Sequence, residues 1–185
     1  MALNIVEEVQ KDMGFEHLEK VDPNTQEPAA TEVFTSPVSA TAQGAIPAVL
    51  AAFYKKTRTE ADVATLLDNA KTGNYLHALY GDNDLDAVEE VAEYSKITRA
   101  DAGIAMEKSA AATMEVLRAE VKDFSPKAVS EFFTEQRTNI LHYLPASLHM
   151  GQLLDDNTID DRTHKMEGPV SGIMHAIESV FSTSK

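Results

Sequence analysis

The stretch NYLHAL at residues 74–79 returns almost unchanged as NILHYL at residues 139–144. An offset of 65 to 67 residues aligns these hexapeptides together with a longer set of apolar positions: VLAA (49–52) with VLRA (116–119), Val63 with Val129, and Leu66 and Leu67 with Phe132 and Phe133. The apolar positions and the expected helix ends of the two segments coincide over some thirty residues. The spacing therefore predicts that one helical unit occurs twice in the chain.

The composition favours helices throughout. Ala, Leu, Glu and Lys are abundant, Trp is absent and there are 8 glycines in 185 residues, which is typical of helical rather than sheet proteins. We expect an all-α, multihelical single domain over residues 1–155, with repeat one near 31–80 and repeat two near 98–145. Two such units, each burying one face, are expected to pack about a pseudo-twofold axis.

Several helix starts can be recognised from their capping residues. TEAD at 59–62 and TRAD at 98–101 both have the form of a capping box. Ser36 and Ser125 each precede a proline, which suits an N-cap followed by the first helical position. Pro47 falls inside the helix that begins after Ser36, where it is expected to kink that helix or to delay its start.

The C-terminal part lies outside the predicted duplication. Residues 156–168 are expected to form a polar loop. Residues 169–182 are expected to form a helix that packs on the domain through an apolar stripe: Val170, Ile173, Met174, Ile177 and Phe181.

Charge and cysteine content limit the function classes. The 30 acidic and 16 basic residues give a net charge of −14, which disfavours nucleic acid as a partner because phosphates are bound by clustered Lys and Arg. The absence of cysteine excludes disulfides, thiolate metal sites and cysteine nucleophiles. AIPAVLAAF at 45–53 is the longest apolar run, about half of a membrane span of roughly 20 residues. We expect a cytoplasmic protein without membrane insertion.

Three segments together resemble the YidB-like family of bacterial domains of unknown function: AIPAVLAAF (45–53), AATMEVLRA (111–119) and LHALYGDNDLDAVEEVAEYSKITRADAGIAMEKSA (76–110). The likeness covers roughly residues 1–155 and consists of helix lengths, small residues and turns. It implies an all-helical fold of paired repeats. It implies no activity and no site residues. This chain has fewer glycines and more acidic residues than those domains.

The sequence has no Gly-rich phosphate loop, nucleophile elbow or H-E-x-x-H motif. Two acidic stretches approach the ligand spacing of an EF-hand: Asp82, Asp84, Asp86 and Glu93, and Asp156, Thr158, Asp160 and Glu167. Ala87 and Asp161 stand where that loop requires glycine. We therefore interpret these aspartates as helix-capping residues, with the second stretch in a loop.

The repeated histidines, His77 and His142, are the long-shot candidates for a metal site. If a pseudo-twofold brought them together, two imidazoles could bind a metal ion or transfer a proton. The alternative is that each histidine lies at a helix boundary and hydrogen-bonds a backbone carbonyl, which duplication alone explains. The remaining histidines have no acidic partner at ligand spacing: His17, His149, His164 and His175.

No catalytic residue or cofactor is predicted. The function remains unknown, and the favoured hypothesis is a non-enzymatic helical module that binds a protein partner or forms a homo-oligomer. The alternative is a small-ligand or metal-dependent enzyme with a site between the two repeats. An exposed apolar patch would favour the first hypothesis, and a polar cavity between the repeats the second.

Overall fold

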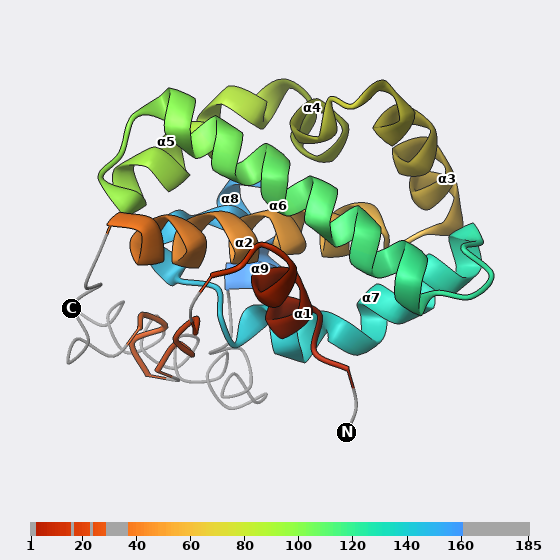
Figure 1. The fold of residues 1–185 in the computed structure, drawn as a ribbon, viewed down its shortest axis with the longest axis horizontal. Helices are drawn as coiled ribbons and strands as arrows, with labels where there is room; N and C mark the ends of the chain where they lie inside the picture. Colours follow the sequence, from red (N-terminus) through yellow and green to blue (C-terminus); the bar gives the residue numbers. More distant parts are fainter. Residues whose placement is uncertain (1–2, 16, 23, 29–36, 161–185) are drawn as a thin grey trace, which may run out of the picture.

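The computed structural model describes residues 3–15, 17–22, 24–28 and 37–160 (Figure 1). Regular secondary structure in these residues is helical, apart from an isolated antiparallel bridge between Val21 and Pro28. The predicted all-α class is confirmed for this part of the chain. The longer helices are α1 (Ile5–Asp12), α2 (Pro37–Lys56), α3 (Glu60–Asn69), α5 (Asp84–Ser95), α6 (Arg99–Glu120) and α7 (Pro126–Leu141). The shorter ones are α4 (Tyr75–Tyr80), α8 (Met150–Leu153), α9 (Asn157–Asp160), and the 3₁₀ turns η1 (Ala70–Thr72), η2 (Gly81–Asn83) and η3 (Ala146–Leu148).

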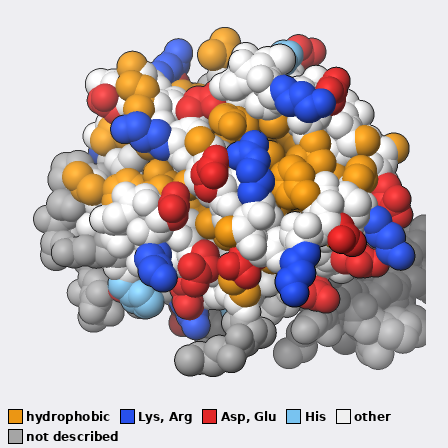
Figure 2. Space-filling view, turned by 45° about the vertical axis from the view of Figure 1, so that its right-hand side comes forward, with side chains coloured by type: hydrophobic (Ala, Val, Ile, Leu, Met, Phe, Trp, Pro, Cys, Tyr) orange, Lys and Arg blue, Asp and Glu red, His pale blue; other side chains and the backbone are white. Residues whose placement is uncertain are grey.

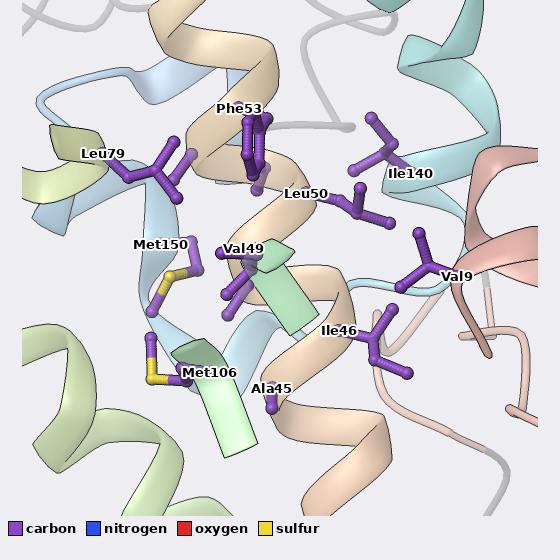
Figure 3. Packing of buried hydrophobic residues seen from close by; sticks show 14 of the residues in the cluster. Val9, Ala45, Ile46, Val49, Leu50, Phe53, Leu79, Met106, Ile140 and Met150 are labelled. Atoms are coloured by element: carbon purple, nitrogen blue, oxygen red, sulfur yellow. The ribbon is translucent and has the colours of Figure 1, made fainter. Parts of the chain in front are cut away.

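Helix α2 lies at the centre of the molecule. Every residue from 42 to 53 is buried, as expected for a helix that is apolar on all sides. Figure 3 shows its side chains pointing in several directions, towards apolar residues from α1, α4, α6, α7 and α8. The helix runs without a break past Pro47. The long apolar run seen in the sequence is therefore the core helix of a globular domain.

Three of the predicted capping residues, Thr59, Thr98 and Ser125, are confirmed, and the fourth, Ser36, lies outside the described residues. The hydroxyl of Thr59 accepts a hydrogen bond from the amide of Asp62, and that of Thr98 accepts one from the amide of Asp101. Ser125 caps α7 in the same way, with Pro126 at the first helical position. Each cap satisfies an amide that the helix itself leaves unpaired, so these short patterns determine where three helices begin.

Corresponding helices of the two predicted repeats are neighbours. Helix α2 packs against α6, and α3 packs against α7. The repeated hexapeptides, however, lie in different settings. Asn74 is the N-cap of α4, whereas Asn139 lies within the last turn of α7. Gly73, with φ of +78°, ends the preceding turn in the first copy, and α7 continues through the corresponding region. The duplication itself remains a prediction.

Helices α2 and α5 approach closely at Gly44. A Cβ atom at this position would lie 3.0 Å from both Ser95 Oγ and Tyr94 Cδ1. The Ser95 hydroxyl donates a hydrogen bond to the carbonyl of Ala40 at 3.1 Å. The absence of a side chain at Gly44 lets the two helices pack at this short distance.

Part of the predicted polar loop is helical. Residues 157–160, placed in a loop from the sequence, form the single turn α9. The loop prediction is wrong there because Asp156 caps this turn, accepting hydrogen bonds from the amide and hydroxyl of Thr158. The predicted helix at 169–182 lies outside the described residues. Among the described helices, none combines the length and apolar character that crossing a bilayer requires.

Candidate functional site

The first of the repeated histidines lies on the surface. His77 on α4 has a side chain that is 60% exposed, and its Nδ1 lies 3.3 Å from Asp84 Oδ2 at the start of α5. This contact joins two consecutive helices. Its partner is a carboxylate, and not the backbone carbonyl considered from the sequence.

The second repeated histidine follows the end of α7. His142 is exposed, and its backbone carbonyl accepts a hydrogen bond from the amide of Val21 at 2.8 Å. Within the described ranges, no group of three or more His, Asp or Glu side chains is arranged to hold a metal ion. His77 and His142 therefore do not belong to a common metal-binding cluster of three or more side chains in the part of the chain that the structure describes.

The two EF-hand-like stretches do not form calcium loops where the structure describes them. Asp84, Asp86 and Glu93 lie within α5, so their side chains follow a helical spacing rather than a loop that surrounds an ion. Asp156 caps α9. The capping interpretation holds for Asp156, whereas Asp84 and Asp86 lie in the first turn of α5 and do not cap it, because its N-cap residue is Asn83. Glu167 lies outside the described residues.

A polar hollow of about 460 Å³ lies between α5 and α8. Seven residues line it: Asn83, Asp86, Glu89, Glu90, His149, Gln152 and Leu153. Asn83 joins its two walls by donating a hydrogen bond to the carbonyl of Leu153 at 3.0 Å. Three of the lining residues are carboxylates, and we refer to this feature as the α5–α8 hollow.

Two of the residues that line the hollow, Glu90 and His149, are in direct contact. His149 Nδ1 lies 3.1 Å from Glu90 Oε2, with the imidazole 60% exposed and the carboxylate 32% exposed. His149 immediately precedes α8 and has a positive φ of +47°, a conformation that non-glycine residues adopt infrequently and that is often found at functional sites. The pair therefore combines a contact between an imidazole and a carboxylate with an unusual backbone conformation.

Sequence reasoning missed this pair. The two residues are separated by 59 positions, and no acidic residue stands at ligand spacing from His149 in the sequence, because only the packing of α8 on α5 brings Glu90 to it. A positive φ at a histidine has no distinctive local sequence signal.

Glu89 has a cationic partner within the chain. Arg99, in the first turn of α6, pairs through its Nε with Glu89 Oε2. The side chain of Arg99 is 74% exposed, whereas that of Glu89 is 33% exposed. A lining carboxylate of the hollow thus already binds a guanidinium group supplied from a neighbouring helix.

The chemistry available to the hollow is that of carboxylates, an imidazole and amides. These groups can bind a cation, accept hydrogen bonds from a polar ligand or hold a proton. The hollow does not lie between the helices of the two predicted repeats, because α5 connects the repeats and α8 follows the second. Comparison with known proteins adds no assignment: no family model, no curated protein and no solved structure matches the chain.

Proposed function

We propose that the protein is a non-enzymatic helical interaction module that binds a protein partner through the α5–α8 hollow. The observation that carries this proposal is the presence of three carboxylates, Asp86, Glu89 and Glu90, in one concave surface. A Lys or Arg side chain of a partner would suit this lining, because a charge-assisted hydrogen bond to a carboxylate is strong and directional.

The charge of the chain supports a cationic partner. A net charge of −14 attracts basic surfaces and speeds their association, especially at low salt. On the face seen in Figure 2, Lys and Arg side chains are separated from one another by acidic, apolar or uncharged ones. Arg99, bound to Glu89, provides an internal example of the group that these carboxylates accept.

Exposed apolar residues provide weaker support for a contact surface. The large hydrophobic side chains exposed in the described residues are Val38, Leu85 and Ile104. Scattered residues of this kind are normal on a protein surface. Leu85 is 77% exposed and directly precedes Asp86, which lines the hollow. It would add apolar area to a contact centred on the start of α5.

The experiment is partner capture with matched variants. The wild-type protein should retain a partner that the double variant Asp86→Asn, Glu90→Gln loses, with weaker retention as salt concentration rises. Glu93→Gln is the control, because Glu93 is an exposed carboxylate on the same helix that does not line the hollow. Equal retention by all three proteins would show that the hollow is not the contact surface. Sedimentation of the purified protein would detect a second copy as the partner.

A second candidate function rests on the Glu90–His149 pair. A histidine oriented by a carboxylate at a concave surface is a common arrangement for proton transfer. In that case the hollow binds a small polar molecule, and His149 accepts a proton from it. Ring resonances of His149 that shift with a small-molecule ligand, and loss of ligand binding in His149→Gln with the Glu93→Gln control unaffected, would favour this function. The resemblance to YidB-like domains supports neither activity.

A further inference from the structure

Cationic side chains of α2 and α7 surround the start of α9. The carboxylate of Asp156 is 4% exposed, and its Oδ2 lies 2.7 Å from an Nη2 of Arg58 and 3.9 Å from Nζ of Lys55. Burying a carboxylate is costly unless cations or hydrogen-bond donors replace the lost water. Arg58 and Lys55 supply that compensation in a chain whose net charge is −14.

Thr158 extends the same network. Its hydroxyl donates to Asp156 Oδ1 at 2.7 Å and accepts from Nη2 of Arg58 at 2.8 Å. Arg137 from α7 donates to the backbone carbonyl of Thr158 at 3.1 Å. Lys55 also donates to the carbonyl of Asp155 at 3.2 Å. Three cations therefore bind one short segment, residues 155–159, which we call the clasp.

The cationic groups belong to the body of the domain. Lys55 lies in the last turn of α2, Arg58 follows that helix by two residues, and Arg137 lies within α7. The guanidinium of Arg58 lies over the ring of Tyr54, 4.9 Å from its centroid, an arrangement that holds an arginine in position. The site would thus keep its shape and charge if the clasp moved away.

The clasp is held to the body mainly by polar contacts. Its helix, α9, is a single turn, which has little stability of its own. Asp156 and Ile159 are its buried residues, whereas Asp155, Asn157 and Thr158 are exposed. A segment with few buried apolar side chains opens locally at lower cost than the core of a domain.

We propose that Lys55, Arg58 and Arg137 form an oxyanion-binding site that Asp156 occupies in cis, and that an external phosphate or carboxylate group displaces the clasp. Asp156 shows the chemistry of the ligand: an oxyanion that forms ion pairs with a guanidinium and, at a longer distance, with an ammonium group. This site is distinct from the α5–α8 hollow, and its charge preference is the opposite one.

Hydrogen exchange on the unaltered protein tests displacement. Sodium phosphate should speed exchange of the amides of Thr158 and Ile159 several-fold relative to sodium chloride of equal ionic strength. Exchange of the α6 amides should not accelerate, because displacement opens the clasp alone. Equal exchange at Thr158 and Ile159 in the two salts would overturn the proposal, and so would parallel acceleration in α6.

A matched pair of variants tests the site itself. Asp156→Asn removes the internal anion, whereas Asp155→Asn removes one exposed negative charge from the neighbouring position. When the phosphate concentration is a few times the dissociation constant, phosphate should raise the melting temperature of Asp156→Asn by about 2–4 °C more than that of Asp155→Asn. The comparison cancels the general stabilisation that phosphate gives to proteins.

Adding Arg58→Gln to Asp156→Asn should abolish that extra gain, because the guanidinium is the main anion ligand. Phosphate stabilisation that is the same in all these proteins would overturn the proposal. If Asp156→Asn does not fold, the exchange experiment on the unaltered protein decides the question alone.

Discussion

The rings of Phe53 and Phe133 stack in nearly parallel planes, with centroids 5.5 Å apart and an interplanar angle of 6°. Phe53 lies on α2 and Phe133 on α7, and both are fully buried. Their contact joins the central helix to a helix that begins some seventy residues later in the chain.

Replacing Phe133 by alanine should destabilise the fold strongly. The variant loses a stacked aromatic contact and leaves a cavity, so the free energy of unfolding should fall by about 3–5 kcal/mol in urea denaturation. Phe132→Ala is the control, since Phe132 is half-buried and its truncation leaves a smaller void. Equal losses for the two variants would contradict the central role of the stacked pair.

Two glycines in helices should respond to alanine in opposite ways. At Gly44 a Cβ would lie 3.0 Å from side-chain atoms of Ser95 and Tyr94, so Gly44→Ala should lower the free energy of unfolding by about 1–3 kcal/mol through overpacking. At Gly103 the nearest atoms, on Val88, are 3.9 Å away. Gly103→Ala should therefore raise the free energy of unfolding by about 0.5–1 kcal/mol, because alanine has a higher helix propensity than glycine. Thermal or urea denaturation of both variants measures the difference.

Tyr80→Phe should not destabilise the protein. Tyr80 is 5% exposed, and its hydroxyl has no hydrogen-bond partner among the described residues. Removing an unsatisfied buried hydroxyl should leave the free energy of unfolding unchanged or raise it by about 1–2 kcal/mol. Tyr143→Phe is the contrasting variant: its hydroxyl donates to Glu7 at 3.2 Å, and losing that bond should cost about 0.5–1.5 kcal/mol. A clear loss of stability in Tyr80→Phe would reveal a partner for its hydroxyl.

Stability should decline at alkaline pH partly because of Tyr143. Burial, together with the hydrogen bond to Glu7 and the negative charge of that residue, raises the pKa of Tyr143 to about 12. In the unfolded chain the pKa of tyrosine is about 10. The folded-state pKa is the higher one, so the stabilising contribution of Tyr143 is complete below pH 10 and is lost as the pH rises towards 12.

The measurement is urea denaturation at a series of pH values from 9.5 to 11.5. Tyr143→Phe should show a shallower decline than the wild-type protein over this range. Tyr75→Phe, a substitution at a half-buried tyrosine, serves as the control. Identical pH dependence in wild type and Tyr143→Phe would contradict the assigned pKa.

Local patterns predicted the helices well because their signals act over a few residues. Thr59, Thr98 and Ser125 each cap a helix by accepting from an amide three positions away, and such contacts form wherever the local sequence allows them. The turn at α9 escaped prediction. The sequence predicts Asp156 as a capping residue but places the residues after it in a loop, whereas Asp156 accepts from the amide of nearby Thr158 and a helical turn follows.

The candidate sites could not be predicted in the same way. The sequence directed attention to His77 and His142 because they recur in similar hexapeptides, yet the pair at the hollow is Glu90 with His149. A repeated hexapeptide does not imply that its two copies lie close together, whereas an ion pair requires two side chains to be in contact. No property of Glu90 or His149 alone distinguishes them from other acidic residues and histidines.

By itself, the sequence determined the helical class, the acidity, the apolar segment at 45–53 and the starts of α3, α6 and α7, because composition and short-range hydrogen bonds depend on neighbouring residues. Tertiary structure alone decided that Glu90 meets His149, that Arg58 reaches Thr158 over 100 positions, and that buried Gln43 bonds both Glu19 and Tyr143. These contacts depend on how whole helices pack, and packing is set by the shape and volume of the entire core. No stretch of a few residues contains that information.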